Sequence, residues 1–127
     1  MKETNLKKKI EFYFKRRGFW YQRDAFGEVG AADIKLYKRP WLIGLELKNR
    51  PTLQAALLNF SKIQRYQALK ILQAGGKVFL FNHSKKDNIY SLVLWKLIPG
   101  VHDIQANSIK RFYKLESIFE TMKLKYE

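Results

Sequence analysis

Two carboxylates and one ammonium group stand out in the first half of the chain, because their surroundings predict that they meet. Glu46 and Lys48 lie two residues apart in the apolar stretch from Trp41 to Asn49, and residues at that spacing project from the same face of a β-strand. Asp33 lies on the strand expected before it, and Arg39-Pro40 marks the turn of a hairpin. We therefore expect Asp33, Glu46 and Lys48 to share one site.

These residue types suit metal-assisted hydrolysis of a phosphodiester. Hard divalent cations take oxygen ligands, and Asp33, Glu46 and the backbone carbonyl of Leu47 could hold Mg²⁺, with Mn²⁺ as a substitute. Such an ion polarises a phosphoryl oxygen and helps to form hydroxide. Lys48 would orient the water or stabilise charge on the phosphate. The simpler alternative is a solvated polar strand face, but the apolar character of the strand favours the site.

Charge is the most informative bulk property. Lys and Arg number 25 against 11 Asp and Glu, a formal net charge of +14, and such a field attracts polyanions. We expect nucleic acid as the partner and no membrane, because a membrane-surface protein needs an exposed apolar stripe opposite its basic residues. The candidate phosphate contacts lie in the first and last expected helices: Lys7, Lys8, Lys9, Lys15, Arg16, Arg17, Lys110 and Arg111.

The chain has no cysteine, which excludes disulfides, cysteine-ligated zinc and a cysteine nucleophile. This composition fits a reducing compartment. The basic N-terminal segment lacks the apolar region of a secretory signal. We therefore expect a cytoplasmic protein, and its small size fits a prokaryotic, phage or viral origin.

The expected elements form a single domain over residues 1–127. Apolar periodicity and turn residues predict helices at 2–17, 61–74 and about 108–124, and strands at 19–23, 31–37, 41–49, 77–81 and 89–95. This order favours an α/β fold in which helices flank one central mixed β-sheet. The core would span about 2–97, followed by a basic helix within about 104–124.

Several motifs around these residues resemble one nuclease family. An acidic residue, a hairpin and Glu-x-Lys, here Asp33 and Glu46-Leu47-Lys48, resemble the signature of the PD-(D/E)XK nuclease superfamily. The stretch from residue 3 to about 82 is similar to its virus-type replication-repair nuclease (VRR-NUC) and Holliday-junction resolvase branch. Gly30-Ala31-Ala32-Asp33 resembles the Gly-x-x-Asp motif of that branch, and Ser61-Lys62-Ile63-Gln64 resembles its Ser-x-x-Gln. Residues 51–60 make the connection between Glu46-Leu47-Lys48 and the helix containing Gln64 longer than in compact members of the branch.

The resemblance implies a restriction-endonuclease-like core of order α-β-β-β-α-β, and it adds Gln64 to the catalytic residues. It also implies a carboxylate from the first helix. Glu3 and Glu11 both qualify, and Glu3 is preferred because it falls within the apolar arc of that helix.

The function expected from these features is Mg²⁺-dependent, structure-specific cleavage of branched DNA, as by a Holliday-junction resolvase. Two symmetric cuts in a four-way junction imply a homodimer. The alternatives are a nicking or flap repair nuclease, a phage genome-processing nuclease, and a non-catalytic nucleic-acid-binding module.

Overall fold

The chain forms an α/β domain built on one mixed sheet. The computed structural model describes residues 3–23 and 33–126, with side chains described for 5–23 and 33–122. Within these residues, six strands pair in the order β1-β2-β3-β4-β5-β6. The strands are β1 (Trp20–Arg23), β2 (Ile34–Lys38), β3 (Trp41–Lys48), β4 (Lys77–Ser84), β5 (Ile89–Leu97) and β6 (Ile104–Phe112). The expected class, a mixed sheet flanked by helices, is confirmed.

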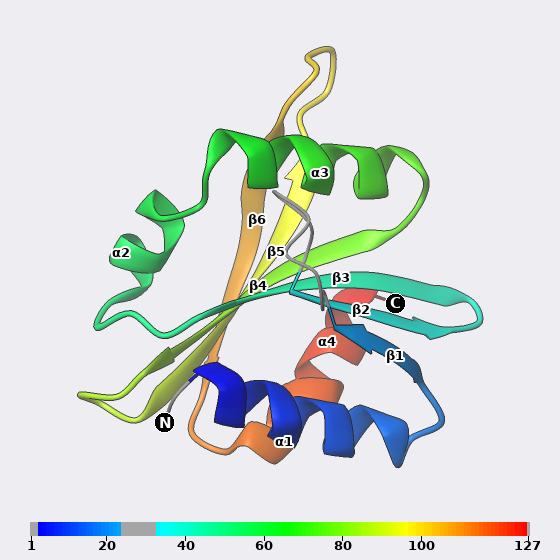
Figure 1. The fold of residues 1–127 in the computed structure, drawn as a ribbon. Coiled ribbons are helices and arrows are strands. Elements are labelled where there is room, and N and C mark those ends of the chain that lie inside the picture. The colour runs from blue at the N-terminus through cyan, green and yellow to red at the C-terminus, as the bar shows by residue number, and fades with distance from the viewer. Residues whose placement is uncertain (1–2, 24–32, 127) are drawn as a thin grey trace.

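Helices cover both faces of this sheet (Figure 1). They are α1 (Glu3–Lys15), α2 (Leu53–Leu58), α3 (Lys62–Gln73), the short 3₁₀ helix η1 (Leu115–Ser117) and α4 (Ile118–Tyr126). Neighbouring strands run antiparallel except β3 and β4, which are parallel. A parallel pair needs a crossover, and α2 and α3 form it. They cover one face, while α1 and α4 lie on the other (Figure 1).

The alternation of side chains along the strands divides the core between these faces. Leu45 and Leu47 of β3 are buried in the cluster that includes residues of α1 and α4. Leu80 of β4 is buried in the second cluster, with residues of α2 and α3. Glu46 and Lys48 alternate with the two leucines, so they face α2 and α3.

The expected basic helix within 104–124 is wrong over its first half, where residues 104–112 form the edge strand β6. The error arises because a helical spacing also fits the residues Ile104, Ser108, Ile109 and Phe112. The decisive factor is tertiary, because β6 pairs with the otherwise open edge of β5. Ile104 and Phe112 are buried at its two ends. The helix begins only at Ile118, and Lys110 and Arg111 lie on the strand.

Among the helices of the described residues, none is both long enough and apolar enough to cross a membrane.

Candidate active site

Asp33 lies directly before β2 and bonds to the backbone of β3. Its Oδ2 accepts a hydrogen bond from the Leu47 amide at 2.8 Å, at the point where the β2–β3 ladder ends at Ile34 and Leu45. The N–H and C=O of one strand residue face the same neighbouring strand. The Leu47 carbonyl therefore faces the side on which Asp33 lies, as the expected pair of metal ligands requires.

Glu46 and Lys48 are buried charged residues, with 5% and 9% of their surface exposed. They lie opposite Leu80 and Asn82 of β4. Burial of a charged group is costly unless polar partners compensate it, and both side chains have such partners. Gln64 Nε2 donates to Glu46 Oε1 at 2.8 Å, and Lys48 Nζ donates to Asn59 Oδ1 at 3.0 Å.

Gln64 is held in place by the start of α3. Ser61 is the N-cap residue, and its Oγ accepts from the Gln64 amide at 3.1 Å. In return, Gln64 Oε1 accepts from the Ser61 amide at 2.9 Å, which completes a capping box. The same side chain still has an amide donor to offer, and that donor reaches Glu46. The Ser-x-x-Gln motif therefore begins the helix and also orients the group that contacts the carboxylate.

Residues 51–60, which lengthen the connection, supply the partner of Lys48. Thr52 caps the N-terminus of α2, accepting from the Ala55 amide at 3.1 Å. Asn59 is the C-cap residue, with its backbone N–H directed to carbonyls of the same helix. Its side-chain oxygen is then free of the helix backbone and meets Lys48. Sequence reasoning missed Asn59, and an asparagine after a helix is as typical of an ordinary C-cap.

The chain leaving β3 is fastened to β4 by two polar side chains. Asn82 is 1% exposed; its Oδ1 accepts from the Arg50 amide at 2.9 Å, and its Nδ2 donates to the Arg50 carbonyl at 3.2 Å. Ser84 Oγ donates to the Pro51 carbonyl at 2.7 Å. The strand expected at 77–81 continues to Ser84. These contacts fix the end of β3, where Lys48 lies.

Lys7, expected as a phosphate contact, lies beside Asp33. Its Nζ is 3.5 Å from Asp33 Oδ1, and the two side chains are 24% and 21% exposed. The Tyr21 hydroxyl donates to the Lys7 carbonyl at 3.2 Å, which ties α1 to β1. Burial raises the pKa of that hydroxyl, so it remains a donor at neutral pH. The candidate site has two ammonium groups, that of Lys7 beside Asp33 and that of Lys48 beside Asn59.

The carboxylate expected from the first helix is not identified. The side chain of Glu3 lies outside the described side chains. Glu11 is directed elsewhere, since its carboxylate oxygens lie 3.6 Å from Lys15 Nζ and 4.0 Å from an Arg23 nitrogen. Where side chains are described, no group of three or more histidine, aspartate or glutamate residues gathers as metal ligands would.

The remaining expected phosphate contacts lie on the sheet face opposite Glu46 and Lys48 and on the edge strand β6. All of them are exposed: Lys8, Lys9, Lys15, Arg16 and Arg17 on or after α1, and Lys110 and Arg111 on β6. Arg17 already has contacts within the protein. Its guanidinium lies 3.6 Å from the Tyr13 ring centroid and donates to the Tyr13 carbonyl at 3.1 Å.

Compared with protein-family models and with curated proteins, the sequence matches none of them. The geometry of the described residues is what bears on function.

Proposed function

We propose that this protein is a metal-dependent endonuclease that cleaves branched DNA, with Asp33, Glu46 and Lys48 at its active site. The observation that carries the proposal is the 2.8 Å hydrogen bond from the Leu47 amide to Asp33. It joins the Asp33 carboxylate to the strand residue that lies between the buried Glu46 and Lys48. One carboxylate directly before β2, and a second carboxylate with an ammonium group on β3, are groups that metal-assisted phosphodiester hydrolysis can use.

The donor set fits a hard divalent cation. Asp33, Glu46 and the Leu47 carbonyl offer oxygen ligands, which Mg²⁺ and Mn²⁺ prefer over nitrogen or sulfur. These three groups would hold the ion. When bound, it supplies Lewis-acid polarisation of the phosphate and a source of hydroxide at neutral pH.

Lys48 and Gln64 assist the metal ligands, Lys48 by neutralising charge on the phosphate and Gln64 by positioning Glu46. Lys48, held by Asn59 at 3.0 Å, provides a fixed positive charge for the anionic phosphate as negative charge develops on it. Gln64 fixes Glu46 through their 2.8 Å hydrogen bond, and the partners of metal ligands commonly set ligand orientation in this way. Overall, one water is added across a P–O bond, and the leaving oxygen takes up a proton.

The order of elements supports a restriction-endonuclease-like core. The succession α1-β1-β2-β3-α3-β4 has the expected α-β-β-β-α-β order, with α2 as an addition. The net charge of +14 supports a polyanionic substrate. We take this substrate to be a four-way junction in the cytoplasm, cleaved by a homodimer that makes two symmetric cuts.

The decisive experiment incubates the protein with a labelled four-way junction or a linear duplex of matched sequence, in Mg²⁺, Mn²⁺ or chelator. Paired cuts in the junction that need metal are expected. Asp33→Asn/Glu46→Gln should abolish cleavage and retain binding. The matched control is Asp87→Asn/Glu120→Gln, which changes net charge equally at two exposed positions and should cleave normally. Full activity of Asp33→Asn/Glu46→Gln would refute the site. A panel of nicked and flap substrates distinguishes a junction resolvase from a nicking or flap nuclease.

A second candidate function, a non-catalytic nucleic-acid-binding module, is favoured by one observation. Both carboxylates have protein partners, Lys7 for Asp33 and Gln64 for Glu46, so they could balance charge without a metal. This alternative predicts salt-sensitive binding that does not respond specifically to Mg²⁺, with no cleavage of any substrate in the panel.

A further inference from the structure

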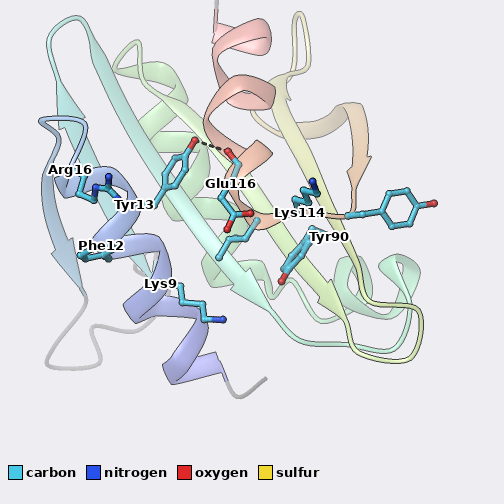
Figure 2. Close-up of a pocket in the computed structure, with 9 residues that line it drawn as sticks. Lys9, Phe12, Tyr13, Arg16, Tyr90, Lys114 and Glu116 are labelled. Carbon is cyan, nitrogen blue, oxygen red and sulfur yellow. Dashed lines mark hydrogen bonds between the residues drawn. The ribbon is translucent and has the colours of Figure 1, made fainter.

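A groove of about 420 Å³ lies between α1 and the segment 113–116 (Figure 2). It is on the face of the sheet covered by α1 and α4, whereas Glu46 and Lys48 face α2 and α3. Lys9, Phe12 and Arg16 extend from α1, and Lys114 and Glu116 come from the facing segment (Figure 2). The groove is therefore distinct from the candidate active site, although α1 borders both.

The floor of the groove is aromatic and fixed. The Tyr13 hydroxyl donates to the Glu116 carbonyl at 2.7 Å, which ties α1 to η1. Tyr90 stacks between its neighbours, with ring centroids 4.5 Å from His83 and 5.6 Å from Phe112. Burial raises the pKa of both tyrosines, so both hydroxyls stay protonated at neutral pH. The groove is thus preformed and needs no rearrangement to open.

The rim combines cations with exposed aromatic rings. Lys9, Arg16 and Lys114 are exposed, and Glu116 is the acidic residue among the described lining residues. Phe12 is 64% exposed and Tyr113 is 74% exposed. The Arg16 guanidinium lies 5.3 Å from the Phe12 ring centroid, so a planar cation is held against an aromatic ring at the edge of the groove.

We infer that this groove binds an unpaired strand of DNA, with Lys9, Arg16 and Lys114 at its phosphates and Phe12 and Tyr113 stacked on its bases. A basic groove with accessible aromatic rings is the combination that binds single strands without reading their sequence. A duplex does not fit this chemistry, because its bases are stacked on one another and offer no free face.

An anionic membrane is the competing polyanion, and α1 does not suit it. A helix that lies on a membrane needs an exposed apolar stripe. The apolar residues Leu6, Ile10 and Phe14 of α1 are at most 1% exposed, so they are committed to the core. Phe12 is surrounded by cations, which favours stacking on a DNA base over insertion into a membrane.

The inference rests on the proposed function in one respect, the choice of DNA as the polyanion. One helix serves both sites, since Lys7 approaches Asp33 while Lys9, Phe12 and Arg16 line the groove. A branched or flapped DNA contains paired and unpaired parts, and the groove would retain an unpaired part while a duplex arm occupies the active site.

The test measures binding of labelled oligothymidine, about 12 nucleotides long, and of a duplex of equal length by fluorescence anisotropy in chelator. Phe12→Leu/Tyr113→Leu removes both rings and keeps the charge. It should weaken oligothymidine binding about tenfold or more and duplex binding less than twofold. The matched control, Trp20→Leu/Tyr37→Leu, removes two cross-strand neighbours that are 57% and 47% exposed outside the groove, and should bind both ligands as wild type does.

Several outcomes would overturn the inference. Unchanged oligothymidine binding, or equal weakening for both DNAs, would remove the role of the rings. If the Phe12→Leu/Tyr113→Leu variant lost binding to phosphatidylserine vesicles but kept oligothymidine binding, the groove would be assigned to membranes. If circular dichroism shows that the variant is misfolded, photocrosslinking of wild-type protein to 5-iodouridine-labelled oligothymidine decides instead, with Phe12 or Tyr113 as the expected attachment points and attachment elsewhere as refutation. Oligothymidine binding without junction cleavage would refute the endonuclease alone.

Discussion

Gln64 of α3 donates a hydrogen bond to Glu46 of β3 at 2.8 Å. The same glutamine closes the capping box of α3 with Ser61, so the start of a helix and the orientation of a buried carboxylate depend on one side chain. Glu46 is 5% exposed, and a buried charge without polar partners is costly. The glutamine therefore acts as a positioning residue for Glu46.

Replacement of Gln64 by methionine, which keeps its length but removes the amide, should lower the cleavage rate about 10- to 100-fold, the range for loss of a partner of a metal ligand. Weaker Mn²⁺ binding, measured by calorimetry, should accompany the loss. Ser61→Ala is the control: it removes the cap and costs about 1 kcal/mol of stability, but leaves the Gln64–Glu46 contact. Equal rate losses in the two variants would mean that only the stability of α3 matters.

Removal of Asn59 should release Lys48. In Asn59→Ala the buried ammonium loses its 3.0 Å acceptor, and we expect a cleavage rate about tenfold lower, since small misplacement of a catalytic group is costly. Lys48→Met should abolish cleavage. Thr52→Ala is the control, because it removes the N-cap of α2 while Asn59 is kept. A loss as large in Thr52→Ala would assign the effect to the folding of α2.

Lys7 should oppose metal binding at Asp33. Its ammonium lies 3.5 Å from Asp33 Oδ1 and competes with a cation for the same carboxylate. Lys7→Met should therefore tighten Mn²⁺ binding about two- to fivefold, in line with the modest strength of partly exposed ion pairs. Lys8→Met removes the same charge at an exposed neighbouring position, and an equal gain there would indicate a general charge effect. Weaker Mn²⁺ binding in Lys7→Met would show instead that Lys7 orders Asp33.

The parts of the fold that could be predicted are those set by local pattern. The alternation of Leu45 and Leu47 with Glu46 and Lys48 assigns each set to one sheet face, because strand side chains repeat every two residues. The helix predicted at 61–74 is present as α3, and Ser61 caps it. The strand β6 was not predicted, because its spacing fits a helix and only the open edge of β5, contributed by another part of the chain, selects the strand.

The same distinction applies to the site. The proximity of Asp33 to β3 follows from a hairpin, whereas Gln64 was expected at the site only because Ser61-Lys62-Ile63-Gln64 resembles a family motif. Asn59 and Asn82 could not be found in this way. Asn82 bonds to the backbone of Arg50, 32 residues away, and no local pattern reports such a contact. The groove likewise depends on Tyr13 meeting Glu116, 103 residues apart.

Asn82 should contribute to stability by holding the chain at Arg50 against β4. Asn82→Ala would leave the Arg50 N–H and C=O without the partners they have at 2.9 and 3.2 Å. Arg50 is an exposed residue, so the net worth of the two hydrogen bonds, about 0.5–1.5 kcal/mol each, sets the scale. A loss of about 1–3 kcal/mol in the free energy of unfolding is expected from urea titration. Asn107→Ala, at an exposed position of β6, should change stability little. A loss below about 1 kcal/mol in Asn82→Ala would show that water satisfies Arg50 equally well.

Asp103 should make stability depend on acid pH. The Ile104 amide donates to its carboxylate at 2.7 Å, and this bond, together with Arg65 at 3.3 Å, lowers the pKa of Asp103 below its usual range. Since the folded pKa lies below the unfolded value, the unfolded state binds the proton more readily. The stabilisation is therefore full above the unfolded pKa of about 3.9 and is lost as the pH falls through the folded pKa.

The measurement compares urea unfolding of wild type and Asp103→Asn between neutral and acid pH. Wild type should lose more stability than the variant on acidification, so that the difference between them shrinks below a pH of about 4. Most of the effect should persist in high salt, because its largest cause is a backbone hydrogen bond and salt screens only the contribution of Arg65. Arg65 also donates to the Ile104 carbonyl at 2.8 Å, and it follows Gln64 in α3. Parallel pH profiles for the two proteins would show that the Asp103 carboxylate contributes nothing to stability, and that Arg65 holds α3 against β6 through the Ile104 carbonyl alone.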